Sequence, residues 1–140
     1  MKILFVCSGN TGRSPMAQFV MKKLIDDAGF SDKISVSSAA SKPTSGGGIH
    51  EGIAAKLRAE NVPYGEHTAH FITKDDYDAS DLIICMDAGN VEQVEAIVGG
   101  DSAGKISMLL DKDIPWDKNG FATTYDDILR GCKALLNKIA

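Results

Sequence analysis

The sequence predicts an α/β fold in which a parallel sheet carries helices on both faces. Short apolar runs rich in β-branched residues alternate with segments of helical periodicity along the 140 residues. The order strand, helix repeats four times, as expected for parallel strands joined by right-handed crossovers. No linker, repeat or low-complexity segment interrupts the pattern, so we expect one domain over residues 1–140.

The first half of the chain holds two predicted strands and two predicted helices. They are strands at residues 3–7 and 34–40 and helices at residues 14–30 and 49–61. The first strand, ILFVC, is a continuous apolar run typical of a strand buried on both faces. For the helix after it, Ser14 is the expected N-cap, Pro15 suits the first turn, and Gly29 suits the end.

The second half of the chain continues the alternation. We expect strands at residues 81–87 and 105–110, helices at residues 88–100 and 123–139, and one helical turn at residues 73–80. The segment DLIICMD is the most apolar of the predicted strands. The last helix has a long amphipathic stripe, and Thr123 and Thr124 each precede an aspartate by three residues, which is the spacing of a capping box.

Composition and charge exclude several classes of protein. The net charge of −4 argues against a nucleic-acid partner, although it does not exclude an anionic substrate. The three cysteines form no C-x-x-C pair, so we expect no disulfide framework, no zinc site and a cytoplasmic setting. The first apolar run is too short for a signal peptide, and no segment reaches the roughly 20 apolar residues of a membrane span.

The segment CSGNTGRS, residues 7–14, joins the first strand to the first helix and is the candidate site. Ligands of such sheets bind beyond the carboxyl ends of the strands, where backbone N–H groups at a helix N-terminus cradle phosphate. We expect Gly9 to adopt a positive φ and Asn10 to brace the loop. The predicted binding residues for substrate phosphate, or for inorganic phosphate or sulfate, are Ser8, Gly9, Asn10, Thr11, Gly12 and Ser14.

Cys7 and Arg13 are the candidate catalytic residues of this segment. Arg13 offers a planar fork for two phosphate oxygens, and the helix dipole, the loop amides and Arg13 all favour the thiolate of Cys7. The predicted chemistry is transfer of a phosphoryl group to sulfur, followed by hydrolysis, with Ser14 hydrogen-bonded to the sulfur. A lone cysteine is often a small core residue, but the glycines and the Ser-Pro helix start favour the catalytic interpretation.

The segment VCSGNTGRSPMA resembles the active-site signature V-C-x-G-N-x-C-R-S-P-x-A of the low-molecular-weight protein tyrosine phosphatases. The resemblance continues in SVSSAA, HTAH, IICMDAGN and TYDDILRGCKALL. It implies a flavodoxin-like three-layer αβα sandwich with a four-stranded parallel sheet. It also implies a phosphatase that needs no metal and no cofactor and acts on phosphorylated protein or peptide substrates.

Gly12 departs from the family pattern, which has a second cysteine at this position. An oxidised Cys7 therefore has no adjacent thiol with which to form a protective disulfide, and we expect peroxide to inactivate it more irreversibly. His67 and His70 of HTAH are three residues apart, but without a third ligand we expect no metal site.

The general acid is the second departure from the family pattern. The family has an aspartate in an Asp-Pro-aromatic motif, whereas Ile114 precedes Pro115-Trp116 here. A phenolate leaving group with a pKa near 10 benefits from a general acid, and we expect Asp113 to be that acid. Asp117 and Asp111 are the alternatives, and a missing acid is a further one.

Three functions follow from these residues. The main prediction is a protein tyrosine phosphatase, with Trp116 as a pocket wall that stacks on the substrate or, alternatively, as an anchor on the core. A protein arginine phosphatase of the same family is the alternative, because that branch has threonine where Thr11 stands. The displaced acid suggests a third function, a phosphate-binding module with weakened catalysis.

Overall fold

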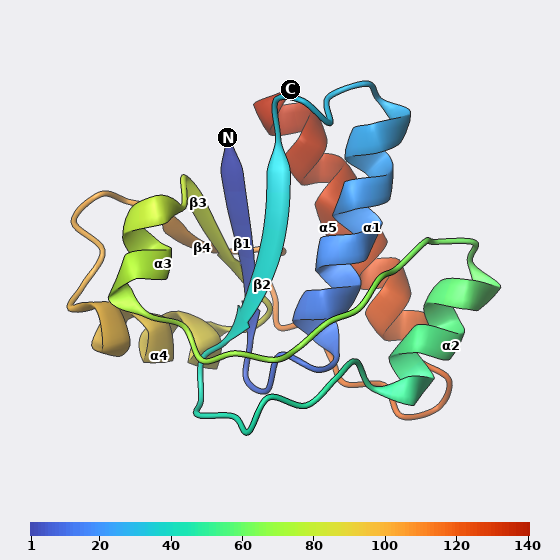
Figure 1. The fold of residues 1–140 in the computed structure, drawn as a ribbon, viewed down its shortest axis with the longest axis horizontal. Coiled ribbons are helices and arrows are strands. Elements are labelled where there is room, and N and C mark those ends of the chain that lie inside the picture. Colours follow the sequence, from blue (N-terminus) through green and yellow to red (C-terminus); the bar gives the residue numbers. More distant parts are fainter.

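The computed structural model describes residues 1–140, which form alternating strands and helices (Figure 1). Its elements are β1 (Lys2–Cys7), α1 (Arg13–Asp27), β2 (Ser35–Ala40), α2 (Glu51–Ala59), α3 (Lys74–Ala79), β3 (Leu82–Cys85), α4 (Ala88–Val98), β4 (Ile106–Met108) and α5 (Ala122–Ile139). The strands form one 4-stranded parallel sheet in the order β2-β1-β3-β4. The predicted four-stranded parallel sheet is therefore confirmed.

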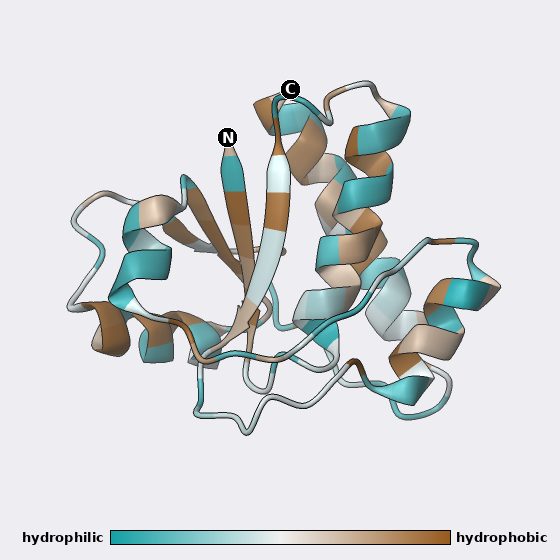
Figure 2. Ribbon diagram, in the orientation of Figure 1, coloured by the Kyte–Doolittle hydropathy of each residue, from teal (hydrophilic) through white to brown (hydrophobic).

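The sheet lies between two layers of helices (Figure 1). Helices α1, α2 and α5 cover one face, where Phe5 of β1 and Ile128 of α5 belong to a core cluster of 20 buried residues. Helices α3 and α4 cover the other, where Val6 of β1 and Val94 of α4 belong to a cluster of 9. Adjacent residues of a strand point to opposite faces, so a strand covered on both sides is apolar along its length, as Figure 2 shows. The predicted three-layer sandwich is confirmed.

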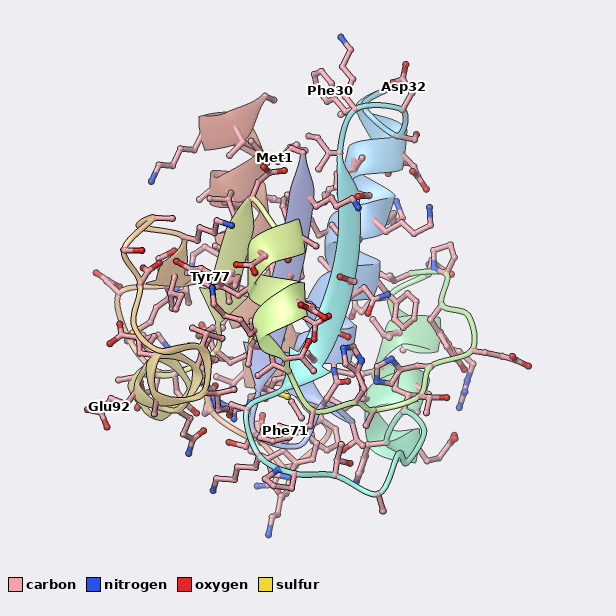
Figure 3. The ribbon with its side chains drawn as sticks, turned by 60° about the vertical axis from the view of Figure 1, so that its left-hand side comes forward. Met1, Phe30, Asp32, Phe71, Tyr77 and Glu92 are labelled. Atoms are coloured by element: carbon pink, nitrogen blue, oxygen red, sulfur yellow. The ribbon has the colours of Figure 1, made fainter.

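The carboxyl end of β1 is the point where the sheet order reverses. The chain crosses from β1 to β2 on one side and then returns past β1 to β3 on the other. In Figure 3 Met1 lies at one end of the sheet and Phe71, which pairs with Ala40 at the end of β2, lies at the other. The loop after β1 opens at the end marked by Phe71, where open parallel sheets bind ligands.

The starts of two long helices differ from the sequence prediction. Ser14 is not the N-cap of α1, because Gly12 holds that position and makes no side-chain cap bond. The capping boxes expected at Thr123 and Thr124 are also absent, since α5 begins after Phe121 in a left-handed conformation. Both differences arise because the hydroxyls of Ser14 and Thr124 bind groups outside their own helices. None of the helices combines the length and hydrophobicity that a bilayer crossing requires.

Candidate active site

The loop between β1 and α1 borders a pocket of about 200 Å³ at the carboxyl end of β1. Its lining residues are Cys7, Gly9, Asn10, Thr11, Gly12, Arg13 and Trp116. The structure therefore brings together both ends of the Cys-x5-Arg motif, most of the predicted phosphate-binding residues and the single tryptophan. Ser8, Ser14 and Asp113 are not among the lining residues.

The sulfur of Cys7 is surrounded by hydrogen-bonding groups. Its Sγ lies 3.0 Å from Oγ of Ser14 and accepts a hydrogen bond of 3.3 Å from the N–H of Asn10. Cys7 is only 3% exposed. The predicted contact between Ser14 and the sulfur is present.

Asn10, not Gly9, has the positive φ in the loop, so that prediction for Gly9 is wrong. Asn10 adopts φ 57°, a region that asparagine tolerates better than most residues. Its Nδ2 donates to Oγ of Ser14 at 2.9 Å, and its Oδ1 accepts from the N–H of His70 at 3.2 Å. Its carbonyl oxygen lies 2.6 Å from Nε2 of His67. The expected bracing role of Asn10 is therefore visible, and its bonds hold the left-handed backbone.

Arg13 is held at the pocket by two contacts of a single nitrogen. Its Nη1 donates to Oδ2 of Asp87 at 2.8 Å and to the carbonyl of Ile114 at 3.0 Å. The Nε and Nη2 groups make no hydrogen bond within the chain, which leaves one edge of the guanidinium for a bidentate anion. Asp87 and the backbone of Ile114 thus orient Arg13, a role that the sequence prediction did not give to either residue.

Helix α4 is tied to the loop through Asn90, whose side chain is fully buried. Its Nδ2 donates to Oγ of Ser8 at 3.2 Å and to Oγ of Ser41 at 3.1 Å. The N–H of Ser41 in turn donates to the carbonyl of Cys7 at 2.9 Å. Ser8 therefore connects the loop to α4 instead of lining the pocket. In the sequence, the signal for Asp87 and Asn90 is the segment IICMDAGN, one of those that resemble the family.

Asp113, the expected general acid, lies beside the N-terminus of α4. It is exposed, and its Oδ1 accepts a hydrogen bond of 2.9 Å from the N–H of Ala88, the residue after Asp87. Asp111 is also exposed. Ile114, which stands where the family has its aspartate, is 1% exposed and belongs to the larger core cluster.

Asp117, the second candidate acid, is committed to the start of α5. Hydrogen bonds from the N–H groups of Thr123 and Asn119 lower the pKa of Asp117 below its ordinary value. A general acid has to carry a proton near neutral pH, and a lowered pKa works against that. The structure therefore argues against Asp117 as the proton donor.

Trp116 lies at the pocket and also packs against other aromatic side chains. It lines the pocket and is 38% exposed, and its ring also packs edge-on against two aromatic side chains. The ring centroids lie 5.2 Å from His50 and 4.7 Å from Phe121. No group of three or more His, Cys, Asp or Glu side chains is arranged to hold a metal ion.

A thiol at the floor of a strand-to-helix loop that ends in an oriented arginine is the arrangement of the cysteine-dependent phosphatases. Comparison with known proteins supports the class and identifies the family. Residues 2–140 match the family model of the low molecular weight phosphotyrosine protein phosphatases. The chain belongs to this family, whose members are hydrolases of phosphoric monoesters that act on phosphorylated proteins.

Three similar proteins illustrate the relationship. The low molecular weight protein-tyrosine-phosphatase YfkJ of Bacillus subtilis is 33% identical, over 98% of this chain and 94% of its own. A low molecular weight phosphotyrosine protein phosphatase of Gallus gallus is 30% identical, over 97% of this chain and 94% of its own. The crystal structure of SP-PTP from Streptococcus pyogenes superposes with a TM-score of 0.91 at 32% identity, covering 99% of this chain and 93% of that one.

Proposed function

We propose that the protein hydrolyses phosphotyrosine in proteins or peptides through a cysteinyl-phosphate on Cys7. The thiolate forms a bond to phosphorus as the bond to the phenolic oxygen breaks, and that oxygen takes a proton from a general acid. Water then attacks the phosphorus, gives up a proton to the same carboxylate, and releases orthophosphate and the thiolate. The observation that carries this proposal is the sulfur of Cys7, hydrogen-bonded by Asn10 and Ser14 in a pocket that Arg13 borders.

The phosphate is proposed to bind to the backbone of the loop and to the free edge of Arg13. Gly9, Thr11 and Gly12 line the pocket together with Asn10, so their amides are near the bound anion. Ser14 stabilises the sulfur as it leaves phosphorus in the second step. Inorganic phosphate or sulfate is expected to occupy the same place and to compete with the substrate.

Asp113 is the proposed general acid. It belongs to the same loop as Trp116, and the residue that it binds, Ala88, adjoins the aspartate that holds Arg13. We would measure turnover of phenyl phosphate and 4-nitrophenyl phosphate by Asp113→Ala, Asp111→Ala and Asp117→Ala. Loss of the acid slows phenyl phosphate by about tenfold or more and slows the better leaving group less. If none of the three variants shows this difference, no aspartate in this loop is the acid.

The choice between phosphotyrosine and phosphoarginine is tested with matched peptides. Thr11 lines the pocket, so its side chain is close enough to the bound group to influence this choice. Wild-type protein and Cys7→Ser are assayed on both peptides across pH. Wild-type turnover that Cys7→Ser abolishes supports the enzyme, and the ratio of the two rates identifies the substrate. Equal background rates with retained peptide binding would instead indicate a phosphate-binding module.

The setting and the domain organisation are part of the proposal. All three cysteines, Cys7, Cys85 and Cys132, are free and buried. Free thiols, one of them the proposed nucleophile, suit a reducing compartment such as the cytoplasm. We also propose that residues 1–140 act as one domain, because both core clusters share the same sheet.

A further inference from the structure

The six-membered ring of the Trp116 indole lies directly on the backbone of Gly12. A Cβ atom built on Gly12 would lie 2.2 Å from Cζ3 and 2.6 Å from Cη2 of Trp116. Carbon atoms in contact are about 3.5–4.0 Å apart, so a side chain at position 12 would displace the ring by more than ~1 Å. The place that Trp116 occupies therefore requires glycine at position 12.

Trp116 is fixed by the residues on both sides of it in the chain. The carbonyl of Pro115 accepts a hydrogen bond of 2.7 Å from the hydroxyl of Thr124, and the same hydroxyl accepts one of 3.0 Å from the N–H of Asp117. One residue earlier, Ile114 is buried in the core. These contacts keep the backbone at Trp116 from moving away from Gly12. A larger residue at position 12 would therefore have to move the indole side chain.

The indole also packs against two aromatic side chains that do not line the pocket. His50 and Phe121 pack edge-on against it, at interplanar angles of 88° and 61°. Phe121 itself rests on a second glycine, since a Cβ built on Gly52 would lie 2.4 Å from Cε2 of Phe121. The cluster of His50, Trp116 and Phe121 is thus packed onto two glycines, and one of these glycines belongs to the phosphate-binding loop.

On the basis of the proposed function, we propose that Gly12 is a positioning residue that seats Trp116 at the mouth of the pocket. The seated indole makes the site prefer phosphate carried on a planar group, aryl or guanidinium, over phosphate on an alkyl chain. Both residues line the pocket, so the indole stands beside the group that carries the bound phosphate. Planar groups gain from stacking on an indole, whereas a flexible alkyl chain gains less. Gly12 acts through the indole and makes no contact with the leaving group.

A double-mutant cycle tests this coupling, with Gly12→Ala, Trp116→Ala and the double variant. Each single variant is expected to raise the KM for an aryl phosphate about fivefold more than it raises the KM for an alkyl phosphate. Gly12→Ala is expected to have no further effect in the Trp116→Ala background. Trp116→Phe, with a smaller ring, is expected to restore part of the aryl preference to Gly12→Ala.

Tryptophan fluorescence gives an independent measurement, because Trp116 is the only tryptophan. Gly12→Ala is expected to shift the emission of Trp116 and to increase its quenching by acrylamide, because the ring can no longer pack against position 12. An equal loss from Gly12→Ala in both backgrounds would overturn the proposal, because Gly12 would then act through the loop backbone. An unchanged ratio of aryl to alkyl kcat/KM in Trp116→Ala would overturn it as well, even if Gly12→Ala does not fold.

Failure of the proposed function would look different from failure of this inference. A wild-type protein without Cys7-dependent phosphatase activity would contradict the proposed function. The fluorescence of Trp116 with and without added orthophosphate would still report whether Gly12 seats the ring. An emission and quenching profile that is the same in wild type and Gly12→Ala would overturn the seating itself.

Discussion

Asp87 performs two tasks that a pair of substitutions can separate. Its Oδ2 forms an ion pair with Nη1 of Arg13 at 2.8 Å. Its Oδ1 accepts a hydrogen bond from the N–H of Asn90 and thereby caps α4. Asp87→Asn keeps a good N-cap but removes the charge, and its amide N–H group would face the N–H donors of Arg13. Asp87→Ala removes the cap and the charge together.

The expected magnitudes follow from these contacts. Loss of an N-cap costs about 1 kcal/mol, so Asp87→Ala should be less stable than Asp87→Asn by about that amount. The side chains of Arg13 and Asp87 are 13% and 21% exposed, so the ion pair is only partly screened by water. Losing it should cost about 1–2 kcal/mol of transition-state stabilisation through the misplaced arginine, or roughly tenfold in kcat/KM for both variants.

Urea denaturation and steady-state hydrolysis of an aryl phosphate measure the two tasks. Asp101→Asn is the control, because Asp101 accepts bonds from Tyr77, Lys105 and Ile106 and lies outside the pocket. It should lose stability and keep wild-type kcat/KM. If Asp87→Asn retains wild-type kcat/KM and the wild-type inhibition constant for orthophosphate, Asp87 serves only as a helix cap and does not orient Arg13.

Three further experiments test Ser14, Asp101 and the buried cysteines. Ser14→Ala removes the hydroxyl that lies 3.0 Å from the sulfur of Cys7. Release of the thiolate in the second step should then be slower, so kcat should fall about tenfold and a burst of product should appear in rapid mixing. An unchanged kcat would contradict the role of Ser14. Partial burial raises the pKa of Asp101, but hydrogen bonds, led by that of Tyr77, outweigh it and lower the pKa below the ordinary value. A lowered carboxylate pKa stabilises the fold above about pH 4 and less as pH falls below it, so the stability gap between wild type and Asp101→Asn should shrink between pH 7 and pH 3. Peroxide should inactivate Cys7 without full recovery by thiol, because Cys85 and Cys132 are buried on other elements; full recovery would show another route of protection.

The loop could be predicted from the sequence because its chemistry is local. Cys7, Arg13 and the small residues between them lie within one strand-loop-helix turn, and the apolar strand before it fixes where that turn opens. The continuous apolar runs and the helical periodicity of apolar residues likewise predict the sheet and its two layers of helices. The alternation of elements does not fix the order of the strands, because a crossover can place the next strand on either side of the last one.

The contacts that orient the loop could not be predicted, because they join residues far apart in the chain. Arg13 binds Asp87 and Ile114, which lie 74 and 101 residues away. The contact of Ser14 with the sulfur of Cys7 spans only 7 residues and is predicted by the sequence, whereas the helix cap that propensity predicts at Ser14 does not form. Gly12 was interpreted through the missing thiol, and its contact with Trp116 depends on packing that no local pattern contains.

Ile114 stands where the family pattern has its aspartate, so a proton donor on this loop has to come from another position. Its N–H donates to the carbonyl of Met86 at 2.9 Å, and its own carbonyl accepts from Arg13 at 3.0 Å. With both backbone groups engaged, its side chain lies in the core at 1% exposure, where an unpaired carboxylate would be strongly disfavoured. The backbone at position 114 therefore orients the arginine while its side chain completes the core. An acid on this loop has to project from a neighbouring residue that remains exposed, and Asp113, directly before Ile114, meets that condition.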